Sequence, residues 1–407
     1  MKTNALILGC LLIVGLMTST FSQDMDSREG DSLALLAIMS INGFPYSDDE
    51  SLLWNKTISI DNWYGISLSG GRIDSLNLGG WGELQLPLEI GNLTKLSYLN
   101  LQATIIPEFP LSMSNLTSLK TLISSNCEYT TVPPGLTEIK SLTYLDFFMN
   151  KLTTLPLALG NLTNLTYLDL SGNKLTTLPL ALGNLTNLTD FRISYNSLTA
   201  LPPEIKYLTN LTNLSLNNNK LDALPFEVKF LTQLTHFSLD FNFLTSLPPE
   251  IGFLTNLIYF GLSENELTGL PLDFKKLTKL SPIDGLDLSR NYLTSSKIPT
   301  EVLPIINVAD PDWAAKQKDP LPVKSVYNSA SPKTGHMAVS VTGAGLNFTR
   351  ALTTTASIEI YTLSGKLITR SALAKGANSL RIDLPSGMFL WSIQESGNIS
   401  SGRITVK

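Results

Sequence analysis

Cysteine is nearly absent from this sequence, which has two cysteines, Cys10 and Cys127, in 407 residues. If the N-terminal segment is cleaved, only Cys127 remains, so no intrachain disulfide can stabilise the fold. Charged residues are also scarce at 15%, below the roughly 25% of an average soluble protein. Hydrophobic residues make up 43%, which is enough for buried cores and excludes a chain that is disordered overall.

Long hydrophobic runs are missing beyond the N-terminus, so we expect no transmembrane segment in the mature chain. Lys2 precedes an apolar run from Ala5 to Met17, which small and polar residues follow. This pattern is typical of a secretory signal peptide, and we expect cleavage after Ser22. A membrane anchor is the alternative, but it needs about 20 apolar residues. The sequence therefore predicts a secreted or cell-surface protein.

Positive charge is scarce in most of the chain, which has 29 basic and 34 acidic residues and a net charge of −5. The segment 324–407 has nine basic and three acidic residues, or +6, which leaves −11 for the residues before it. An acidic surface is unsuited to nucleic acid. Metal-ligand spacings, phosphate loops and nucleotide fingerprints are also missing, so we expect no nucleic acid partner, no metal and no cofactor.

A 23-residue repeat is the main feature that is present. Its asparagines lie one period apart (173 − 150 = 23), and the same position holds Thr104 and Cys127 in earlier repeats. The last step, to Asn291, is 26 residues, which predicts an insertion of three residues near 281–285. A chain that repeats in this way is a stacked solenoid, and such chains bind through extended surfaces.

We predict that the repeated position forms a structural ladder, in which each side chain bonds the backbone of neighbouring coils. Its members are Thr104, Cys127, Asn150, Asn173, Asn196, Asn219, Asn242, Asn265 and Asn291. The preceding LxL pattern predicts a short strand with leucines inside and the residues between them outside. A proline column from Pro87 to Pro271 fits the first turn of short helices, and Glu89, Glu204, Glu227 and Glu250 suit their positive ends.

The repeat LxxLxLxxNxLTxLPxEIxxLTN, as in residues 165–187, resembles leucine-rich repeats from about Arg72 to Leu303. Its length and LPxEI segment are most similar to the class of scribble-like scaffold proteins and bacterial surface proteins. The resemblance implies a parallel β-sheet on the concave face and short helices on the convex face. Before the repeats, 31–41 reads as an amphipathic helix started by Asp31 or Ser32. With Trp54 and Trp63 it resembles an N-terminal cap of plant-type repeats, without the usual cysteine pair.

The C-terminal segment from Ser325 has short alternating stretches separated by Gly, Ser, Asn and Pro, which predict a small antiparallel β-sandwich. The blocks IEIYTLSGKLI, LPSGMFLWSIQ and GRITVK resemble the C-terminal sorting domain of type IX secretion substrates in Bacteroidetes. That resemblance implies a bacterial protein whose secretion machinery recognises this domain. A sandwich that acts as a spacer or binds carbohydrate is the alternative.

The concave face is the predicted binding surface, because exposed aromatic side chains beside polar groups are typical of protein, peptide and glycan contacts. The candidate residues are Tyr98, Tyr144, Asp146, Phe148, Tyr167, Asp169, Asp190, Arg192, Tyr195, His236, Phe241 and Tyr259. Unselected variation on a solvated sheet is the alternative explanation for this pattern.

Catalysis is not expected from these residues. Asp146 and Asp169 fall in adjacent repeats, near the roughly 5 Å carboxylate separation of retaining glycosidases, but an open sheet would not raise the pKa of either one. We expect them to be surface charges paired with Arg192. Cys127 and His236 belong to repeats five apart (5 × 23 = 115), which means roughly 24 Å between strands. A catalytic dyad of these two residues is therefore excluded.

The sequence thus predicts a signal peptide (1–22), an N-terminal cap (23–70), leucine-rich repeats (71–303), a cap or linker (304–324) and a sorting domain (325–407). The expected function is that of a non-enzymatic secreted or surface protein that binds a protein or glycan ligand. The alternative is a structural or adhesive protein in which the solenoid is a spacer.

Overall fold

The computed structural model describes residues 27–42, 59, 63–282, 284–318, 339–342, 345–348, 355–361, 367–377, 379–381, 387–395 and 398–406. The expected signal peptide, Trp54 and residues 319–324 of the expected linker lie outside them. The chain divides into two compact units. The first unit comprises the residues up to Lys151 together with Ala158–Leu168, and the second comprises Leu152–Leu157 together with the residues from Asp169 onward. The domain boundaries proposed from the sequence stay a prediction.

Helix α2 spans Arg28–Ile41 and begins earlier than the sequence predicted. Ser27 is its N-cap, and the Ser27 hydroxyl accepts the Gly30 N–H at 3.1 Å. The expected start at Asp31 or Ser32 is therefore wrong. The Asp31 carboxylate does not cap the helix. This residue faces the repeats and is fully buried.

Asp31 joins helix α2 to the repeats through an ion pair. The Arg72 guanidinium donates to both carboxylate oxygens of Asp31 at 2.9 Å, and the Ile73 N–H donates to one of them at 2.8 Å. A bidentate pair with an additional backbone donor satisfies a buried carboxylate well. The buried face of α2, including Leu35 and Ile38, covers apolar side chains at this end of the solenoid.

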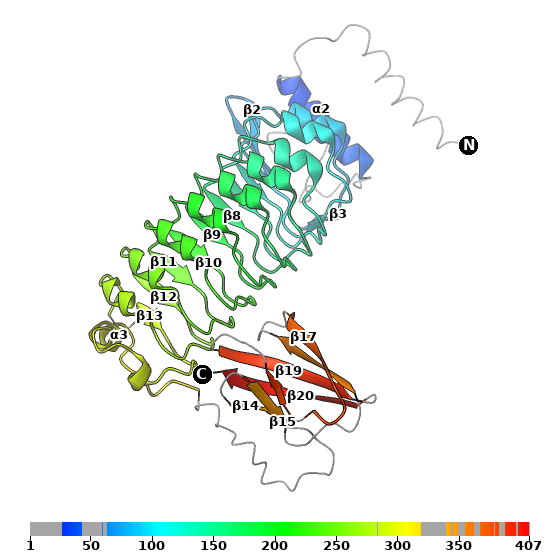
Figure 1. Cartoon of the computed structure of the whole chain (residues 1–407). Helices are drawn as coiled ribbons and strands as arrows, with labels where there is room; N and C mark the ends of the chain where they lie inside the picture. Colours follow the sequence, from blue (N-terminus) through cyan, green and yellow to red (C-terminus); the bar gives the residue numbers. More distant parts are fainter. Residues whose placement is uncertain are drawn as a thin grey trace. The chain divides into compact units, whose positions relative to one another are not determined.

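Eleven strands of the described residues form one sheet in the order β1-β2-β4-β6-β7-β8-β9-β10-β11-β12-β13 (Figure 1). They are β1 (Ile66–Ser69), β2 (Arg72–Asn77), β4 (Tyr98–Asn100), β6 (Thr121–Ile123), β7 (Tyr144–Asp146), β8 (Tyr167–Asp169), β9 (Asp190–Arg192), β10 (Asn213–Ser215), β11 (His236–Ser238), β12 (Tyr259–Gly261) and β13 (Leu286–Asp287). β1 is antiparallel to β2, and the pairings described within each unit after that are parallel. A second sheet joins β3 (Gly82–Glu83) to β5 (Thr104–Ile105).

Parallel pairing occurs at the repeat period, which confirms the predicted register. In the first unit Leu99 pairs with Leu122 and Leu122 with Leu145, while in the second Leu214 pairs with Phe237. These central strand residues are completely buried. Fully burying one such side chain stabilises the fold by about 1.5–3 kcal/mol, so the stacked columns supply most of the hydrophobic core.

The three-residue insertion lies between β12 and β13, as predicted. Phe260 pairs with Leu286 at a separation of 26 residues (286 − 260). The Ser281 N–H donates to Ile258 O at 2.9 Å, and the Gly285 N–H donates to Ser281 O at 2.9 Å. A Cβ on Gly285 would lie 2.1 Å from the Ser281 nitrogen, so the loop requires glycine there. Gly285 is buried, and it presents no side chain on the sheet.

Short helices follow the strands of each repeat, as predicted, but they are 3-10 helices of five residues. Their bounds are η2 (Leu88–Asn92), η3 (Leu111–Asn115), η4 (Pro134–Glu138), η5 (Leu157–Asn161), η6 (Leu180–Asn184), η7 (Pro203–Tyr207), η8 (Phe226–Phe230), η9 (Pro249–Phe253) and η10 (Leu272–Lys276); the shorter η11 is Ser295–Lys297. Figure 1 shows them along one side of the repeats, with the strands on the other.

The proline column precedes these helices, and its predicted place in the first turn is wrong. Pro225, for example, is the N-cap of η8 with extended backbone (φ −71°, ψ 151°). Its carbonyl accepts the Val228 N–H at 3.2 Å. Proline fits because the N-cap contributes its carbonyl to the helix, and a fixed φ near −65° costs nothing there.

The asparagines at the predicted ladder position bond backbone groups of neighbouring coils. The Asn196 Oδ1 accepts the Leu175 N–H of the preceding repeat at 2.9 Å, and its Nδ2 donates to Leu170 O at 3.0 Å and Ile193 O at 3.1 Å. Asn219, Asn242, Asn265 and Asn291 repeat this pattern, and Asn150 and Asn173 make corresponding bonds. Each amide thus satisfies buried backbone groups of two coils.

Thr104 and Cys127 make only part of this pattern. The Thr104 hydroxyl donates to Leu78 O at 2.7 Å, and the Cys127 thiol donates to Leu101 O at 3.0 Å. Both side chains are buried, as a ladder position requires. The last repeat is covered by helix α3 (Leu303–Ala309) and the turn that follows, where Trp313 is buried.

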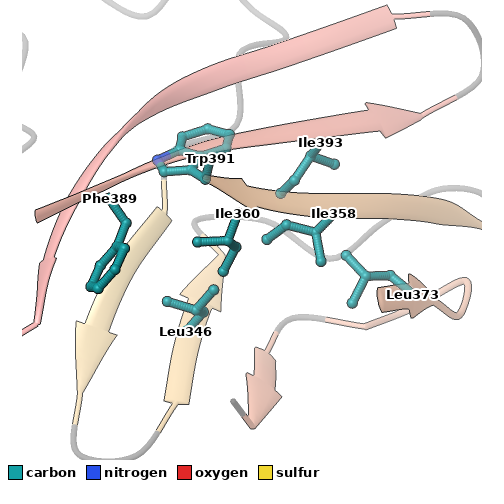
Figure 2. Close-up of a cluster of buried hydrophobic side chains, with 7 residues drawn as sticks. All are labelled: Leu346, Ile358, Ile360, Leu373, Phe389, Trp391 and Ile393. Carbon is teal, nitrogen blue, oxygen red and sulfur yellow. The ribbon is translucent and has the colours of Figure 1, made fainter. Parts of the chain in front are cut away.

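The C-terminal segment forms two antiparallel sheets, in agreement with the predicted sandwich. One has the order β14-β15-β18 and the other β17-β16-β19-β20. The strands are β14 (Val339–Thr342), β15 (Gly345–Phe348), β16 (Ala356–Tyr361), β17 (Leu367–Leu373), β18 (Ser379–Arg381), β19 (Gly387–Glu395) and β20 (Asn398–Val406). Their core contains Leu346, Ile358, Ile360, Leu373, Phe389, Trp391 and Ile393, which Figure 2 shows converging.

Candidate functional site: the strand face of the repeats

The strand face consists of the outward side chains of the short strands, six and four positions before each ladder residue. In the first unit Tyr144 and Tyr167 lie on this face with their rings stacked 4.1 Å apart and only 1° from parallel. Tyr98 lies two strands from Tyr144, with Thr121 between them. All three tyrosines are half-buried. The stacking covers one face of each ring.

The two aspartates of this face hold turns. The Asp146 Oδ1 accepts the Phe148 N–H at 2.8 Å, and the Asp169 Oδ1 accepts the Ser171 N–H at 2.8 Å. Short acidic side chains often bond the backbone two residues onward in this way. Asp169 is only 8% exposed, so its predicted exposure is wrong. Asp146 is half-buried and retains some outward surface.

In the second unit the charged residues of the strand face neutralise one another. The Arg192 guanidinium donates to both carboxylate oxygens of Asp190 at 3.0 Å. The Asn213 amide also donates to Asp190, at 3.3 Å. The Arg192 side chain remains 44% exposed.

His236 and Tyr259 form a second aromatic pair, with ring centroids 6.3 Å apart. The His236 Nδ1 lies 3.0 Å from the Thr235 hydroxyl, which fixes the orientation of the imidazole. His236 is exposed and Tyr259 is half-buried. The two residues lie 23 positions apart and are paired on neighbouring strands.

Asp240 is a member of this surface that the sequence analysis missed. The Ser263 N–H and hydroxyl donate to its Oδ1 at 2.9 and 2.7 Å, and burial raises the pKa of the Asp240 carboxyl. A Cβ on Gly261 would lie 2.3 Å from the other oxygen. Burial, together with the charges of Asp240 and Asp287, raises the pKa of Tyr259 to about 12. The glycine in an otherwise polar column was the available signal.

Two predicted contact residues have an unusual backbone. Tyr195 and Phe241, with φ of +55° and +56°, occupy the position just before the ladder asparagine and are 62% and 52% exposed. Met149 has the same place and conformation in the first unit, with φ +56° and 52% exposure. The left-handed region costs a non-glycine residue roughly 1–2 kcal/mol. Gly172 and Asn218 show which residues suit this column.

Phe148 precedes that column by one residue and is 42% exposed. The structure therefore places exposed apolar side chains just after strands β7, β9 and β11, beside the outward positions of those strands. The predicted site residues thus fall into three groups: stacked rings, turn-forming aspartates and exposed strand-end residues.

Catalytic features are few on the part of the chain that the structure describes. No group of three or more His, Cys, Asp or Glu side chains could hold a metal ion there. Cys127 is buried, and this burial raises the pKa of its thiol, which disfavours the thiolate. None of the helices among these residues is long and apolar enough to cross a membrane.

The fold and its outward columns define a leucine-rich-repeat solenoid, the architecture of a protein-interaction scaffold. Residues 140–184 match the family model described as leucine-rich repeats (2 copies). Proteins with such repeats are generally binding scaffolds without enzymatic activity.

Three solved structures are similar to this chain. A leucine-rich-repeat protein of Leptospira interrogans is 33% identical, with a TM-score of 0.47, over 56% of this chain and 65% of that one. An internalin of Listeria monocytogenes is 25% identical, with a TM-score of 0.41, over 51% of this chain and 65% of its own. A plant ice-binding protein is 24% identical, with a TM-score of 0.45, over 65% and 80%. The match thus spans just under two thirds of the two bacterial proteins.

Proposed function

We propose that this chain is an exported, non-catalytic protein that binds a protein ligand through the strand face of its repeats. The stacked pair Tyr144 and Tyr167 is the observation that carries the proposal. A rigid aromatic pair offers contact area at little entropic cost, and tyrosine is enriched among the residues that dominate protein interfaces.

The stacking favours a protein over a glycan. Sugar rings bind by lying flat against an exposed aromatic face. In the pair of Tyr144 and Tyr167, the rings cover each other at 4.1 Å, so one face of each ring is already occupied. Ring edges and hydroxyls suit the backbone and side-chain hydrogen bonds of a peptide segment.

The second unit offers a separate set of contacts. Tyr195 and Phe241 supply exposed aromatic area, and Arg192 supplies a partly exposed guanidinium group. Aromatic residues and arginine are the commonest anchors of protein interfaces. Both residues occupy the left-handed position that recurs just before the ladder residue in successive repeats, and their side chains are exposed there.

Ligand selection on the purified full chain tests this proposal. A random-peptide phage library would be panned on the wild type, and a glycan array would be probed in parallel. We expect peptide clones whose binding falls at least tenfold in the variant Tyr144→Ser/Tyr167→Ser. Tyr64→Ser is the matched control, because Tyr64 is 63% exposed but lies outside the strand columns.

Three outcomes contradict the proposal. If the peptide clones bind the tyrosine variant as well as the wild type, peptide binding does not depend on the strand face. Glycan binding that survives loss of both tyrosines would favour the rival role, a solenoid spacer with a carbohydrate-binding sandwich. Hydrolysis of either probe would favour an enzyme.

Export and sorting are also part of the proposal. The N-terminal pattern of a signal peptide supports export, and the ordered C-terminal blocks support a type IX sorting domain. Phe389 and Trp391, from the block LPSGMFLWSIQ, belong to the sandwich core. Cell fractionation and mass spectrometry of the mature termini test this part. A cell-internal protein that keeps both Met1 and Lys407 would contradict it.

A further inference from the structure

The helix face of the repeats, on the side away from the strands, carries a second periodic surface. The first residue of each five-residue 3-10 helix is apolar in nine successive repeats. These residues are Leu88, Leu111, Pro134, Leu157, Leu180, Pro203, Phe226, Pro249 and Leu272. Leu111 is 77% exposed and even Leu272 is 46% exposed. The core does not use these side chains, so burial inside the chain does not explain them.

In the second unit an aromatic column is added. The last residues of η7, η8 and η9 are Tyr207, Phe230 and Phe253, which are 52%, 44% and 52% exposed. Phe226, at the start of η8, is 55% exposed. We call the surface made by Pro203, Tyr207, Phe226, Phe230, Pro249, Phe253 and Leu272 the helix-face patch.

The patch is large for a monomer. Four aromatic side chains of about 200 Å² each, exposed by about half, give on the order of 400 Å² before proline and leucine are added. Exposed apolar patches larger than a few hundred Å² mark interaction sites. Stable complexes bury about 800 Å² per partner, with a polar rim around an apolar centre. The helix-face patch therefore supplies the apolar centre of a contact of that size.

Lysines are held on this patch by its rings. The Lys206 Nζ lies 5.0 Å from the Tyr207 ring centroid, and the Lys276 Nζ lies 5.4 Å from that of Phe253. The Lys229 Nζ lies 5.2 Å from the centroids of both phenylalanines of η8. Attraction between an ammonium group and a ring face fixes these charges at the surface of the patch.

Carboxylates form a separate column of the same patch. Glu204, Glu227 and Glu250 are the second residues of η7, η8 and η9. Glu227 is only 8% exposed, so the half-buried Glu204 and Glu250 supply the accessible carboxylates. Within the described chain they make no ion pair, and neither do Lys206 and Lys229. Residues two apart on a helix with three residues per turn point to different sides, so η7 carries a lysine and a carboxylate on different sides without pairing them.

The patch is also electrically balanced. Over η7 to η10 the four basic residues are Lys206, Lys229, Lys275 and Lys276, and the four acidic residues are Glu204, Glu227, Glu250 and Asp273. Attraction to an anionic bilayer or another polyanion requires an excess of basic residues. Lys276 and Asp273 pair with each other at 2.9 Å, while Lys206, Lys229, Glu204 and Glu250 make no ion pair among the described residues. A neutral apolar surface of this kind suits a partner that presents the same two columns.

We propose that the helix-face patch binds a second copy of this chain in a two-fold dimer. A two-fold contact places one patch against itself. With the axis running along the columns, the lysine column of each copy lies against the carboxylate column of the other, and the aromatic residues meet at the centre. The strand faces of both copies remain free, so the dimer would present two ligand surfaces and gain avidity for a multivalent ligand.

Sedimentation velocity of the full chain over a concentration series tests the dimer. We expect a reversible monomer–dimer equilibrium, with the dissociation constant raised at least tenfold in the variant Phe226→Ser/Phe230→Ser. The matched control is Tyr195→Ser/Phe241→Ser, which removes two similarly exposed aromatic side chains from the strand side. A wild type that stays monomeric into the millimolar range would overturn the proposal, and so would a control as weakened as the patch variant.

A charge exchange tests the pairing and avoids the apolar substitutions. Lys206→Glu/Lys229→Glu and Glu204→Lys/Glu250→Lys should each weaken self-association, and mixing the two proteins should restore a heterodimer. Failure of the mixture to associate would contradict the pairing of unlike columns. Binding to phosphatidylglycerol vesicles would be measured last. If the wild type is monomeric and binds these vesicles, and the variant without Phe226 and Phe230 does not, the patch is a membrane-binding surface and the dimer proposal is wrong.

Discussion

The side-chain amide of Gln317 makes for the last repeat the bonds that Asn291 makes for the repeat before it. The Gln317 Oε1 accepts the Leu293 N–H at 3.2 Å, and its Nε2 donates to Leu288 O at 3.0 Å. Asn291 bonds the equivalent groups one repeat earlier at 3.0 and 2.8 Å. The step between them is 26 residues (317 − 291), equal to the step from Asn265. The ladder therefore extends into the segment that the sequence analysis assigned to a cap or linker.

Gln317→Ala should destabilise the C-terminal end of the repeats. The substitution leaves the Leu293 N–H without its partner, at a cost of about 1–3 kcal/mol, while the Leu288 carbonyl keeps its bond from the Asn291 amide at 3.1 Å. Urea unfolding would measure the loss, and amide exchange should accelerate at Leu293. Gln317→Asn is the control, because it keeps the amide and shortens its reach. Unchanged exchange at Leu293 in the alanine variant would contradict the ladder role.

Cys127→Asn should stabilise the fold by about 0.5–1.5 kcal/mol, the net worth of one hydrogen bond. An asparagine there would offer an acceptor to the Ile106 N–H, the group that the repeat pattern assigns to it. The thiol donates to Leu101 O but accepts no such bond. A higher urea midpoint would support this expectation, with Cys127→Ala as a control that should lower it. A midpoint for Cys127→Asn below that of the alanine variant would contradict it.

Tyr195→Asn should raise stability by about 1 kcal/mol, because asparagine tolerates the left-handed backbone better than tyrosine. Asn218 has the same φ of +55° in the next repeat. Thermal unfolding would detect the gain, and the selected peptides should bind the variant less well. Tyr144→Asn is the control: it removes a stacked ring from a strand and should destabilise. A loss of stability in Tyr195→Asn would show that its ring matters to the fold.

Tyr259 should make stability fall at alkaline pH. Its pKa is raised from 10.0 to about 12 by burial and by Asp240 and Asp287, so the folded state favours the neutral phenol. The contribution is complete below pH 10 and is lost as pH rises towards 12. Tyr259→Phe should be less sensitive in that window. The phenolate absorbance would be titrated in the wild type and in Tyr259→Phe, and the difference between the two curves should show one group with a pKa near 12. A pKa near 10 for that group would contradict the buried environment of Tyr259.

Asp240→Asn should lower the pKa of Tyr259 without restoring its ordinary value. The substitution removes a neighbouring negative charge, while burial, the largest cause of the shift, remains. The pKa of Tyr259 in this background would be measured as the difference in phenolate absorbance between Asp240→Asn and Asp240→Asn/Tyr259→Phe.

Contacts between residues one repeat apart could be predicted from the sequence. Contacts between residues at other separations could not. Asn196 and its equivalents were assigned to the ladder from their spacing, and the spacing also placed Tyr144 beside Tyr167. Asp31 and Arg72 are 41 residues apart and outside any period, so nothing in the sequence linked them. The left-handed backbone of Tyr195 could not be predicted, because the position holds neither glycine nor asparagine, the residues that indicate this conformation.

The sequence by itself determined the repeat period, the register of the strands and the choice of buried residues, because each repeat contacts mainly its neighbours and identical contacts recur. The tertiary structure decided the ring stacking, the ends of the solenoid and the raised pKa of the Asp240 carboxyl. Those properties depend on distances between residues at irregular separations and on how much water each group loses, and both are set only when the coils are stacked.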